Sequence, residues 1–157
     1  MILAIDAGNK QSGYAILKDD YTPFAFGKVP NEELEKIMEG LEGIDLIVLE
    51  MVASYGMAVG ETVFDTCVEI GRLQYISETI APVWMVKRKE YVTDLCGSSR
   101  AKDSNVVQYL IDRFAKDTPN RGKGTKKAKG WFYGFKADCW QAYAIGVWAL
   151  DKLKEEK

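Results

Sequence analysis

The spacing of hydrophobic residues along the chain predicts five strands and four helices. Short apolar runs are typical of buried strands, and apolar residues three or four positions apart are typical of helices. The predicted strands cover residues 2–7, 12–18, 24–29, 44–49 and 83–86, and the predicted helices begin near residues 30, 61, 103 and 138. The resulting order is βββαβαβαα. We find no repeat and no linker, so we expect one domain over residues 1–157.

The ends of these elements are predicted from turn and cap residues. The short segment 19–23 joins the second and third strands, which favours an antiparallel meander. Gly43 is expected to stop the first helix, and Asp103 with Ser104 to cap the third. The run 44–49 is interrupted only by Asp45, so we place it in the centre of the sheet. A basic, glycine-rich loop is expected to follow the third helix to about residue 130.

The composition excludes several kinds of chemistry. The chain has 157 residues, 47% of them hydrophobic and 28% charged, which is ordinary for a folded domain. It has no histidine, which excludes Ser–His–Asp hydrolases, Cys–His proteases and histidine zinc sites. Cys67, Cys96 and Cys139 form no C-x-x-C pair, so we expect free thiols. Neither a signal peptide nor an apolar run of about 20 residues is found, so we expect a cytoplasmic protein.

The net charge of −2 hides a strong asymmetry along the chain. Residues 84–136 hold thirteen Lys or Arg against five Asp or Glu, so this segment carries +8 and the remainder −10. The densest part, residues 121–129, is followed by the aromatic residues Trp131, Phe132, Tyr133 and Phe135. Lysines attract phosphates and aromatic rings stack on unpaired bases, so this region favours contact with DNA or RNA. A solvated loop beside a core aromatic strand is the alternative.

Three carboxylates occupy positions where a hydrophobic core would not place them. Asp6 and Glu50 each end an apolar strand, and Asp138 opens a helix rich in alanine. A carboxylate there is costly to bury unless a cation or a hydrogen-bond donor meets it. If the first and fourth strands are neighbours, Asp6 and Glu50 face one crevice, and oxygen ligands without histidine suit Mg²⁺ or Mn²⁺. Taken singly, Asp6 could cap a turn, Glu50 could lie at a strand edge and Asp138 could cap its helix.

Three segments resemble the RuvC family of Holliday junction resolvases. Residues 4–16, which read AIDAGNKQSGYAI, are similar to the D-x-G-x-x-x-x-G-[YW] opening of that family, and residues 47–50, IVLE, to its second acidic strand. Residues 136–146, KADCWQAYAIG, resemble its final helix. The resemblance implies an α/β protein with a ribonuclease-H-like fold, a mixed five-stranded sheet flanked by helices. It also implies a Mg²⁺- or Mn²⁺-dependent endodeoxyribonuclease, acting as a homodimer on branched DNA, in a version that looks like a bacteriophage protein.

The same resemblance implies roles for individual residues. Asp6, Glu50 and Asp138 match the family's acidic ligands, while Gln141 stands where the family has a fourth carboxylate and remains a candidate metal ligand without charge. Lys102 is the candidate for phosphate contact and transition-state charge, although the family's lysine falls one position later, where this chain has Asp103. The candidate DNA-binding residues are Tyr55, Lys87, Arg88, Lys89, Arg100, Arg121, Lys123, Lys126, Lys127 and Lys129.

The function predicted from these features is metal-assisted hydrolysis of a phosphodiester at Holliday junctions and other branched DNA, in recombination or phage DNA processing. A junction-binding protein with weakened or lost catalysis is the main alternative, because Gln141 removes one charge from the site. A third class, the actin-like or sugar-kinase ATPases, shares a similar Asp-x-Gly turn. Those proteins need two such domains, and 157 residues provide one.

Overall fold

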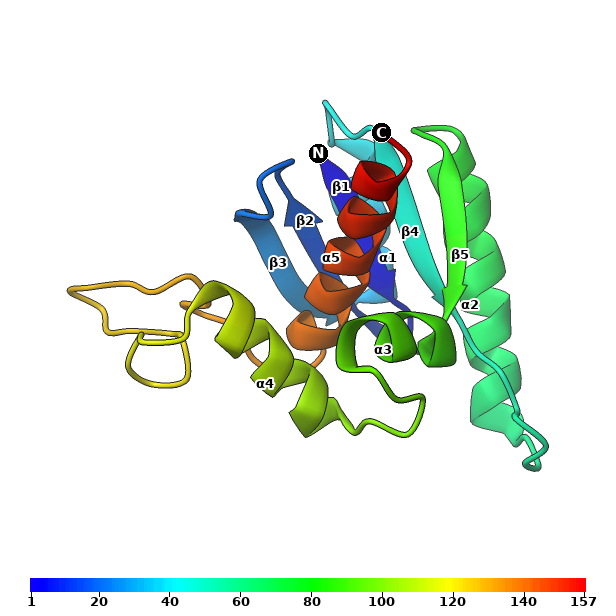
Figure 1. Cartoon of the computed structure of the whole chain (residues 1–157). Coiled ribbons are helices and arrows are strands. Elements are labelled where there is room, and N and C mark those ends of the chain that lie inside the picture. Colours follow the sequence, from blue (N-terminus) through cyan, green and yellow to red (C-terminus); the bar gives the residue numbers. More distant parts are fainter.

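A mixed five-stranded sheet forms the centre of the molecule (Figure 1). The computed structural model describes all 157 residues. The strands stand in the order β3-β2-β1-β4-β5; β2 is antiparallel to both β1 and β3, whereas β4 is parallel to β1 and β5 to β4. Their bounds are β1 Ile2–Asp6, β2 Gln11–Leu17, β3 Pro23–Pro30, β4 Leu46–Met51 and β5 Val83–Lys87. The predicted meander, and the neighbouring first and fourth strands, are confirmed.

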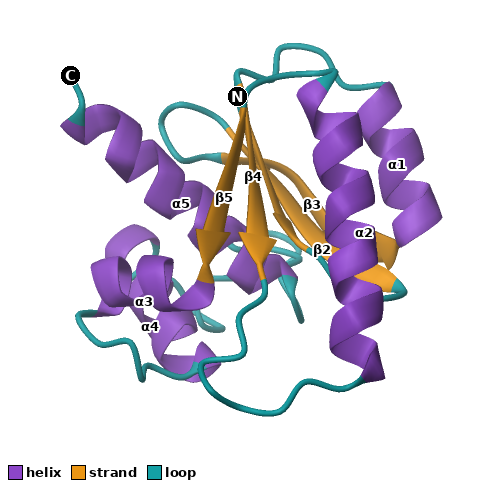
Figure 2. Cartoon of the chain, turned by 90° about the vertical axis from the view of Figure 1, so that its right-hand side faces the viewer, coloured by secondary structure: helices purple, strands orange, loops and turns teal.

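Helices cover both faces of this sheet (Figure 2). One face carries α1 (Asn31–Glu39) and α2 (Glu61–Glu78). The other carries α3 (Arg88–Cys96), α4 (Asp103–Phe114) and α5 (Cys139–Glu155), with α5 lying across β1 and β2. The predicted sheet flanked by helices is therefore confirmed. None of the helices combines the length and the apolar character needed to cross a membrane.

The alternation of side chains along β1 divides the hydrophobic core into two parts. Ile2 and Ala4 pack in the larger cluster, which includes α5, while Leu3 and Ile5 pack in the smaller cluster with α1. Successive residues of a strand point to opposite faces, so a strand buried on both faces must be apolar at every position. This explains the continuous run that precedes Asp6.

The structure contains one helix that the sequence analysis missed. Residues 88–96 form α3, directly after β5, although no element was predicted there. Charged residues dominate its first turn, and only Tyr91, Val92 and Leu95 are buried. Two signals were nevertheless present. The Lys87 backbone N–H donates to Glu90 Oε2 at 2.7 Å, and Gly97 ends the helix in the left-handed conformation.

Some element boundaries also differ from the prediction. Helix α1 ends at Glu39 and is capped by Gly40, whereas Gly43, with a φ of 73°, turns the chain toward β4. Helix α4 begins at Asp103 itself, with Lys102 as its N-cap residue. Strand β4 begins at Leu46 and includes Glu50 as a strand residue. These shifts leave the topology unchanged.

Candidate functional site

One row of residues across the sheet places the first two candidate carboxylates together. Lys28 of β3 pairs with Gly13 of β2, and Gly13 pairs with Asp6 of β1. The neighbouring parallel strands pair Ala4 with Val48, so Asp6 and Glu50 are the next positions on this same face. The alternating pattern that buries Ala4 and Val48 against α5 therefore directs Asp6 and Glu50 toward that helix.

The third carboxylate, Asp138, lies over Gly13. A Cβ atom on Gly13 would come within 2.8 Å of the Asp138 Cβ, so only glycine allows this approach. Asp138 immediately precedes α5, but it makes no side-chain cap hydrogen bond. Its Oδ2 instead forms an ion pair with Lys28 Nζ at 2.9 Å. The second glycine of the N-terminal motif thus serves to seat Asp138, and capping does not explain that carboxylate.

The first glycine of the motif shapes the turn between β1 and β2. A Cβ atom on Gly8 would lie 2.3 Å from the Gln11 carbonyl oxygen. Asn31 Nδ2 donates to the Gly8 carbonyl at 3.0 Å, and Ser12 Oγ donates to Asn31 Oδ1 at 2.7 Å. These contacts fasten the turn to the start of α1, so Asp6 stands at the end of a strand whose following turn is fixed.

The raised pKa of Asp6 indicates that the acidic cluster has little positive charge close to it. Burial raises the pKa of Asp6 well above its ordinary range, and the hydrogen bond with Glu50 and the charges of Glu50, Asp138 and Asp103 raise it further. Two adjacent carboxylates that share a proton form a site that can exchange this proton for a cation. Tyr91, fully buried, donates from its hydroxyl to Glu50 Oε1 at 3.1 Å and so orients that carboxylate.

The side chains of the predicted metal ligands are only partly gathered. No three Asp, Glu or Cys side chains lie together in an arrangement that could hold a metal ion. Asp6 and Glu50 are adjacent, Asp138 is paired with Lys28, and Gln141 Oε1 accepts from Arg88 Nη1 at 3.1 Å. Lys102 is exposed, and its backbone N–H donates to Asn105 Oδ1. The donor set of Asp6 and Glu50, with Asp138 nearby, fits a hard divalent cation.

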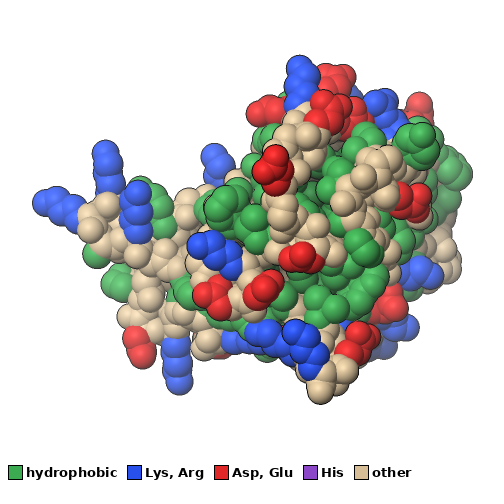
Figure 3. Space-filling view, turned by 90° about the horizontal axis from the view of Figure 1, so that it is seen from above, with side chains coloured by type: hydrophobic (Ala, Val, Ile, Leu, Met, Phe, Trp, Pro, Cys, Tyr) green, Lys and Arg blue, Asp and Glu red, His purple; other side chains and the backbone are tan.

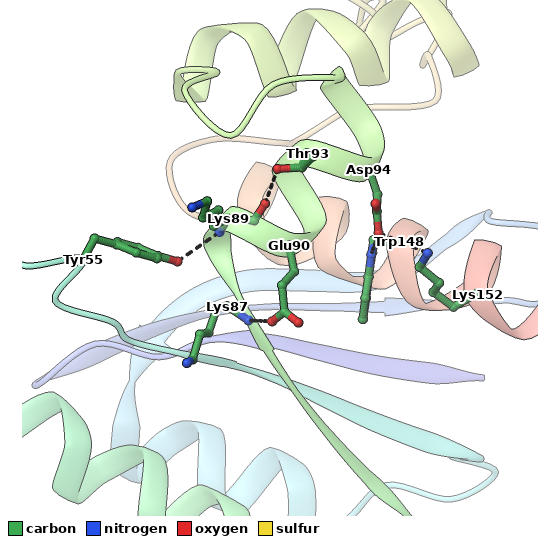
Figure 4. A pocket seen from close by; sticks show the side chains of 8 residues that line it. All are labelled: Tyr55, Lys87, Lys89, Glu90, Thr93, Asp94, Trp148 and Lys152. Atoms are coloured by element: carbon green, nitrogen blue, oxygen red, sulfur yellow. Dashed lines mark hydrogen bonds and ion pairs between the residues drawn. The ribbon is translucent and has the colours of Figure 1, made fainter.

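Three of the predicted DNA-binding residues line one pocket beside β5 and α3 (Figure 4). The pocket has a volume of about 520 Å³ and is lined by Tyr55, Lys87, Lys89, Glu90, Thr93, Asp94, Trp148 and Lys152. The Lys89 backbone N–H donates to the Tyr55 hydroxyl at 3.2 Å, which holds the loop after β4 against α3. Tyr55 is 54% exposed, so it lies on the surface and is not a core residue.

A second group of candidate residues lies on a projecting segment, residues 116–130, which we call the basic arm. In Figure 1 it extends away from the sheet beyond α4, and Figure 3 shows Lys and Arg side chains standing out from this end. The arm has hydrogen bonds of its own: Asn120 Nδ2 donates to the Gly124 carbonyl at 2.7 Å, and the backbones of Gly124 and Lys129 form a bridge. Five basic side chains are exposed on it, namely Lys116, Arg121, Lys126, Lys127 and Lys129, whereas Lys123 is half-buried.

The aromatic residues that follow the arm are divided between core and surface. Phe132 and Phe135 are fully buried and pack against Trp140 and Tyr143, so neither can stack on a base. Tyr133 is 37% exposed, and Lys129 Nζ lies 5.0 Å from its ring centroid. The rings therefore anchor the basic arm to α5.

Lys28 and Tyr91 were missed as functional candidates. Nothing in the local sequence around Lys28 points to Asp138, because the contact depends on sheet register and on the missing side chain of Gly13. Tyr91 lies in the helix that was not predicted. If residues 88–96 had been predicted as a helix, the spacing of Tyr91, Val92 and Leu95 would have placed Tyr91 on its buried face.

The sheet order and the two helical layers define a ribonuclease-H-like α/β fold with carboxylates at the ends of its two central parallel strands. Among solved structures, RuvC of Thermus thermophilus is similar over 98% of this chain and 96% of its own, with a TM-score of 0.60 and 14% identity. The structure of T. thermophilus RuvC in complex with a Holliday junction substrate gives a TM-score of 0.68 at 11% identity, covering 98% and 95% of the two chains. The sequence matches no protein-family profile and no curated protein.

Proposed function

We propose that this chain is a structure-selective DNA endonuclease that cleaves Holliday junctions and other branched DNA in a reaction assisted by Mg²⁺ or Mn²⁺. The observation that carries the proposal is the adjacent pair of Asp6 and Glu50 at one edge of the sheet, with Asp138 held nearby by Lys28, within a fold shared with RuvC. A bacteriophage origin and a cytoplasmic location stay predictions from the sequence.

The residues of the site suit a hydrolysis that needs no histidine. Asp6 and Glu50 would hold the metal ion, and Asp138 would join them once its carboxylate leaves Lys28. When bound, the ion would polarise the phosphate and favour ionisation of the attacking water. Lys28 keeps Asp138 close to the site before the metal arrives. Tyr91 holds the Glu50 carboxylate through its hydroxyl hydrogen bond.

The surface around the site supports binding of a polyanion. The pocket containing Tyr55, Lys87 and Lys89 lies beside α3, whose first residue, Arg88, contacts Gln141, and Arg100 and Lys102 are exposed on the connection from α3 to α4. The basic arm adds a second positive surface on the far side of α4. Branched DNA carries phosphates in several directions, so separate positive surfaces around one acidic site suit it better than one flat patch.

An exposed apolar stripe on α2 supports a homodimer. Phe64, Val68 and Tyr75 are 60%, 67% and 73% exposed, and their spacing places them on one face of the helix with Gly71 between them. Large exposed apolar groups in a continuous row mark an interface. A symmetric pair of subunits joined along α2 would present two acidic sites to a junction with two strands to cut.

The decisive experiment is incubation of the protein with labelled four-way, three-way and duplex DNA, each with EDTA, Mg²⁺ or Mn²⁺. We expect cleavage of the branched substrates with metal only, and no cleavage of the linear duplex. Asp6→Asn should abolish cleavage, because a metal ligand is lost, while junction binding in EDTA stays equal, because the metal-free Asp6 carboxyl already holds a proton. A variant that loses cleavage and binding together would show that Asp6 is structural.

A junction-binding protein without catalysis is the second candidate. Two observations favour it: Asp138 is neutralised by Lys28, and the fourth position of the acidic set is Gln141. Tight junction binding in EDTA, together with the absence of cleavage at any concentration of Mg²⁺ or Mn²⁺, would select this candidate over the endonuclease.

A further inference from the structure

Arg88 is linked to Glu50 through the hydroxyl group of Tyr91. It is the first residue of α3, and its guanidinium contacts four polar partners. Nη1 donates to Gln141 Oε1 at 3.1 Å and to the Tyr91 hydroxyl at 3.3 Å. Nη2 donates to the Ala101 carbonyl at 3.4 Å and pairs with Asp103 Oδ1 at 2.7 Å. The direction of the guanidinium is therefore fixed before any substrate binds.

Gln141 acts as the acceptor that holds Arg88. An arginine side chain only donates hydrogen bonds, so the amide atom facing it must be the oxygen. Tyr91 has a single hydroxyl proton, and the Glu50 carboxylate at 3.1 Å is a stronger acceptor for it than the Gln141 amide at 3.3 Å. The Gln141 oxygen is thus satisfied by Arg88. A divalent cation on that oxygen would also lie beside a fixed positive charge.

The position of Arg88 links it to the metal-binding carboxylates. The Tyr91 hydroxyl accepts from Arg88 and donates to Glu50, so one hydroxyl group separates the guanidinium from a predicted metal ligand. The Arg88 side chain is 35% exposed, so part of it remains open to substrate. The side chain of Lys102, the cation predicted for phosphate contact, forms no hydrogen bond or ion pair with this network.

The ion pair between Arg88 and Asp103 is suited to exchange. Asp103 is 73% exposed, and an ion pair with such an exposed carboxylate contributes little stability. A phosphate offers the same two-oxygen geometry as the carboxylate, and guanidinium groups bind both in a bidentate manner. Binding of a phosphate could therefore replace Asp103 while Gln141, Tyr91 and Ala101 keep the guanidinium in place.

We propose that Arg88 is a catalytic residue that binds a non-bridging oxygen of the scissile phosphate, and that Gln141 is a positioning residue that orients Arg88. The inference rests on the proposed nuclease function. Arginine stays protonated throughout, so it transfers no proton and stabilises the negative charge that develops on the phosphate. Gln141 then stands in the fourth acidic position because a carboxylate there would pair with Arg88 and weaken its hold on phosphate.

The contact between Arg88 and the phosphate is tested by a double-mutant cycle of junction affinities. One change is Arg88→Ala in the protein, and the other replaces one phosphate of the DNA by a neutral methylphosphonate. The methylphosphonate is moved one position at a time through the three phosphates on each side of the branch point, and affinity is measured in EDTA. At one position, we expect the neutral group to weaken wild-type binding about tenfold and Arg88→Ala binding very little. Lys36→Ala is the matched control, because Lys36 is an exposed cation of α1, on the opposite face of the sheet (Figure 2), and its side chain forms no hydrogen bond or ion pair.

The rate of cleavage gives the second readout. At saturating protein, Arg88→Ala should lower the single-turnover rate about 10²- to 10³-fold, whereas Lys36→Ala should leave this rate unchanged. Gln141→Ala should lower the same rate about tenfold without changing junction affinity. If Arg88→Ala proves unfolded by circular dichroism, Arg88→Lys keeps the charge without the planar fork, and its rate should still fall about tenfold.

The two proposals fail in different ways. An Arg88→Ala protein that cleaves at the wild-type rate, with no coupling to a methylphosphonate at any position, would make Arg88 a structural link between α3, α4 and α5 and overturn this inference alone. Absence of cleavage by the wild-type protein on every branched substrate would overturn the proposed function. The binding cycle does not depend on cleavage, so it still reports whether Arg88 contacts a phosphate in that case.

Discussion

Replacement of Asp6 by asparagine should stabilise the metal-free protein, and by more as the pH rises. Burial and the neighbouring Glu50 raise the pKa of Asp6 in the folded protein, while in the unfolded chain the carboxyl titrates near its ordinary value of 3.8. Between those two pKa values the folded protein keeps a proton that the unfolded chain has released. Folded protein therefore binds more protons, and its stability falls as the pH rises through this window.

The size of the effect follows from the environment of Asp6. Each unit of pKa difference corresponds to about 1.4 kcal/mol, but Asp6 is partly exposed and shares its proton with Glu50. We expect Asp6→Asn to gain about 1–3 kcal/mol at pH 8 and little at pH 4, because asparagine is neutral at both and can still donate to Glu50. For a protein of this size, that gain raises the melting temperature by about 3–10 °C.

The assay is thermal unfolding followed by circular dichroism between pH 4 and pH 8 in EDTA. Asp117→Asn is the matched control, since it removes one exposed carboxylate without contacts and should leave the pH profile unchanged. Addition of Mg²⁺ should then raise the melting temperature of the wild-type protein more than that of Asp6→Asn. A loss of stability in Asp6→Asn that is equal at every pH would refute the reasoning and make Asp6 a structural carboxylate.

Three further perturbations test other parts of the site. Gly13→Ala should displace Asp138, because the new Cβ would lie 2.8 Å from the Asp138 Cβ; we expect at least tenfold slower cleavage and a loss of about 1–3 kcal/mol in a urea titration. The second variant replaces Lys126, Lys127 and Lys129 of the basic arm by alanine. The slope of the logarithm of the DNA association constant against the logarithm of salt concentration should flatten by up to about 0.9 per lost contact, and an unchanged slope would exclude the arm from the DNA interface. Phe64→Glu should yield monomers in analytical ultracentrifugation while the melting temperature changes little, since Phe64 is 60% exposed, and a dimer that persists would place the interface elsewhere.

The candidate carboxylates could be recognised from the sequence because of where they end apolar runs. A strand buried on both faces has no place for a charge, so Asp6 and Glu50 stood out against the residues before them. The glycine motif after Asp6 added the turn, whereas the close approach of Asp138 to Gly13 appeared only in the structure. The number of strands also followed from periodicity, because each buried element must present an apolar face. The mixed sheet and the helices that flank it were expected from the resemblance to the RuvC family.

The cations around those carboxylates could not be assigned from the sequence. Lys28 reaches Asp138 because β3, β2 and α5 meet at Gly13, across more than a hundred residues of chain. Arg88 was expected to bind DNA, but its contacts with Gln141 and Tyr91 depend on the formation of α3. The sequence of that helix is only weakly amphipathic, so it was not predicted. Local pattern carries no information about such partners.

The sequence by itself determined the helices and strands of this protein except α3, the positions of its acidic residues and the excess of positive charge in residues 84–136. Those features depend on local periodicity and composition, which a chain keeps whatever its partners are. Only the tertiary structure decided which charges meet: Lys28 with Asp138, Arg88 with Gln141, and Phe132 inside the core instead of on a DNA-binding surface. The interaction energy of a charged group depends on its distance from other charges and on its burial. Both quantities exist only in the folded chain.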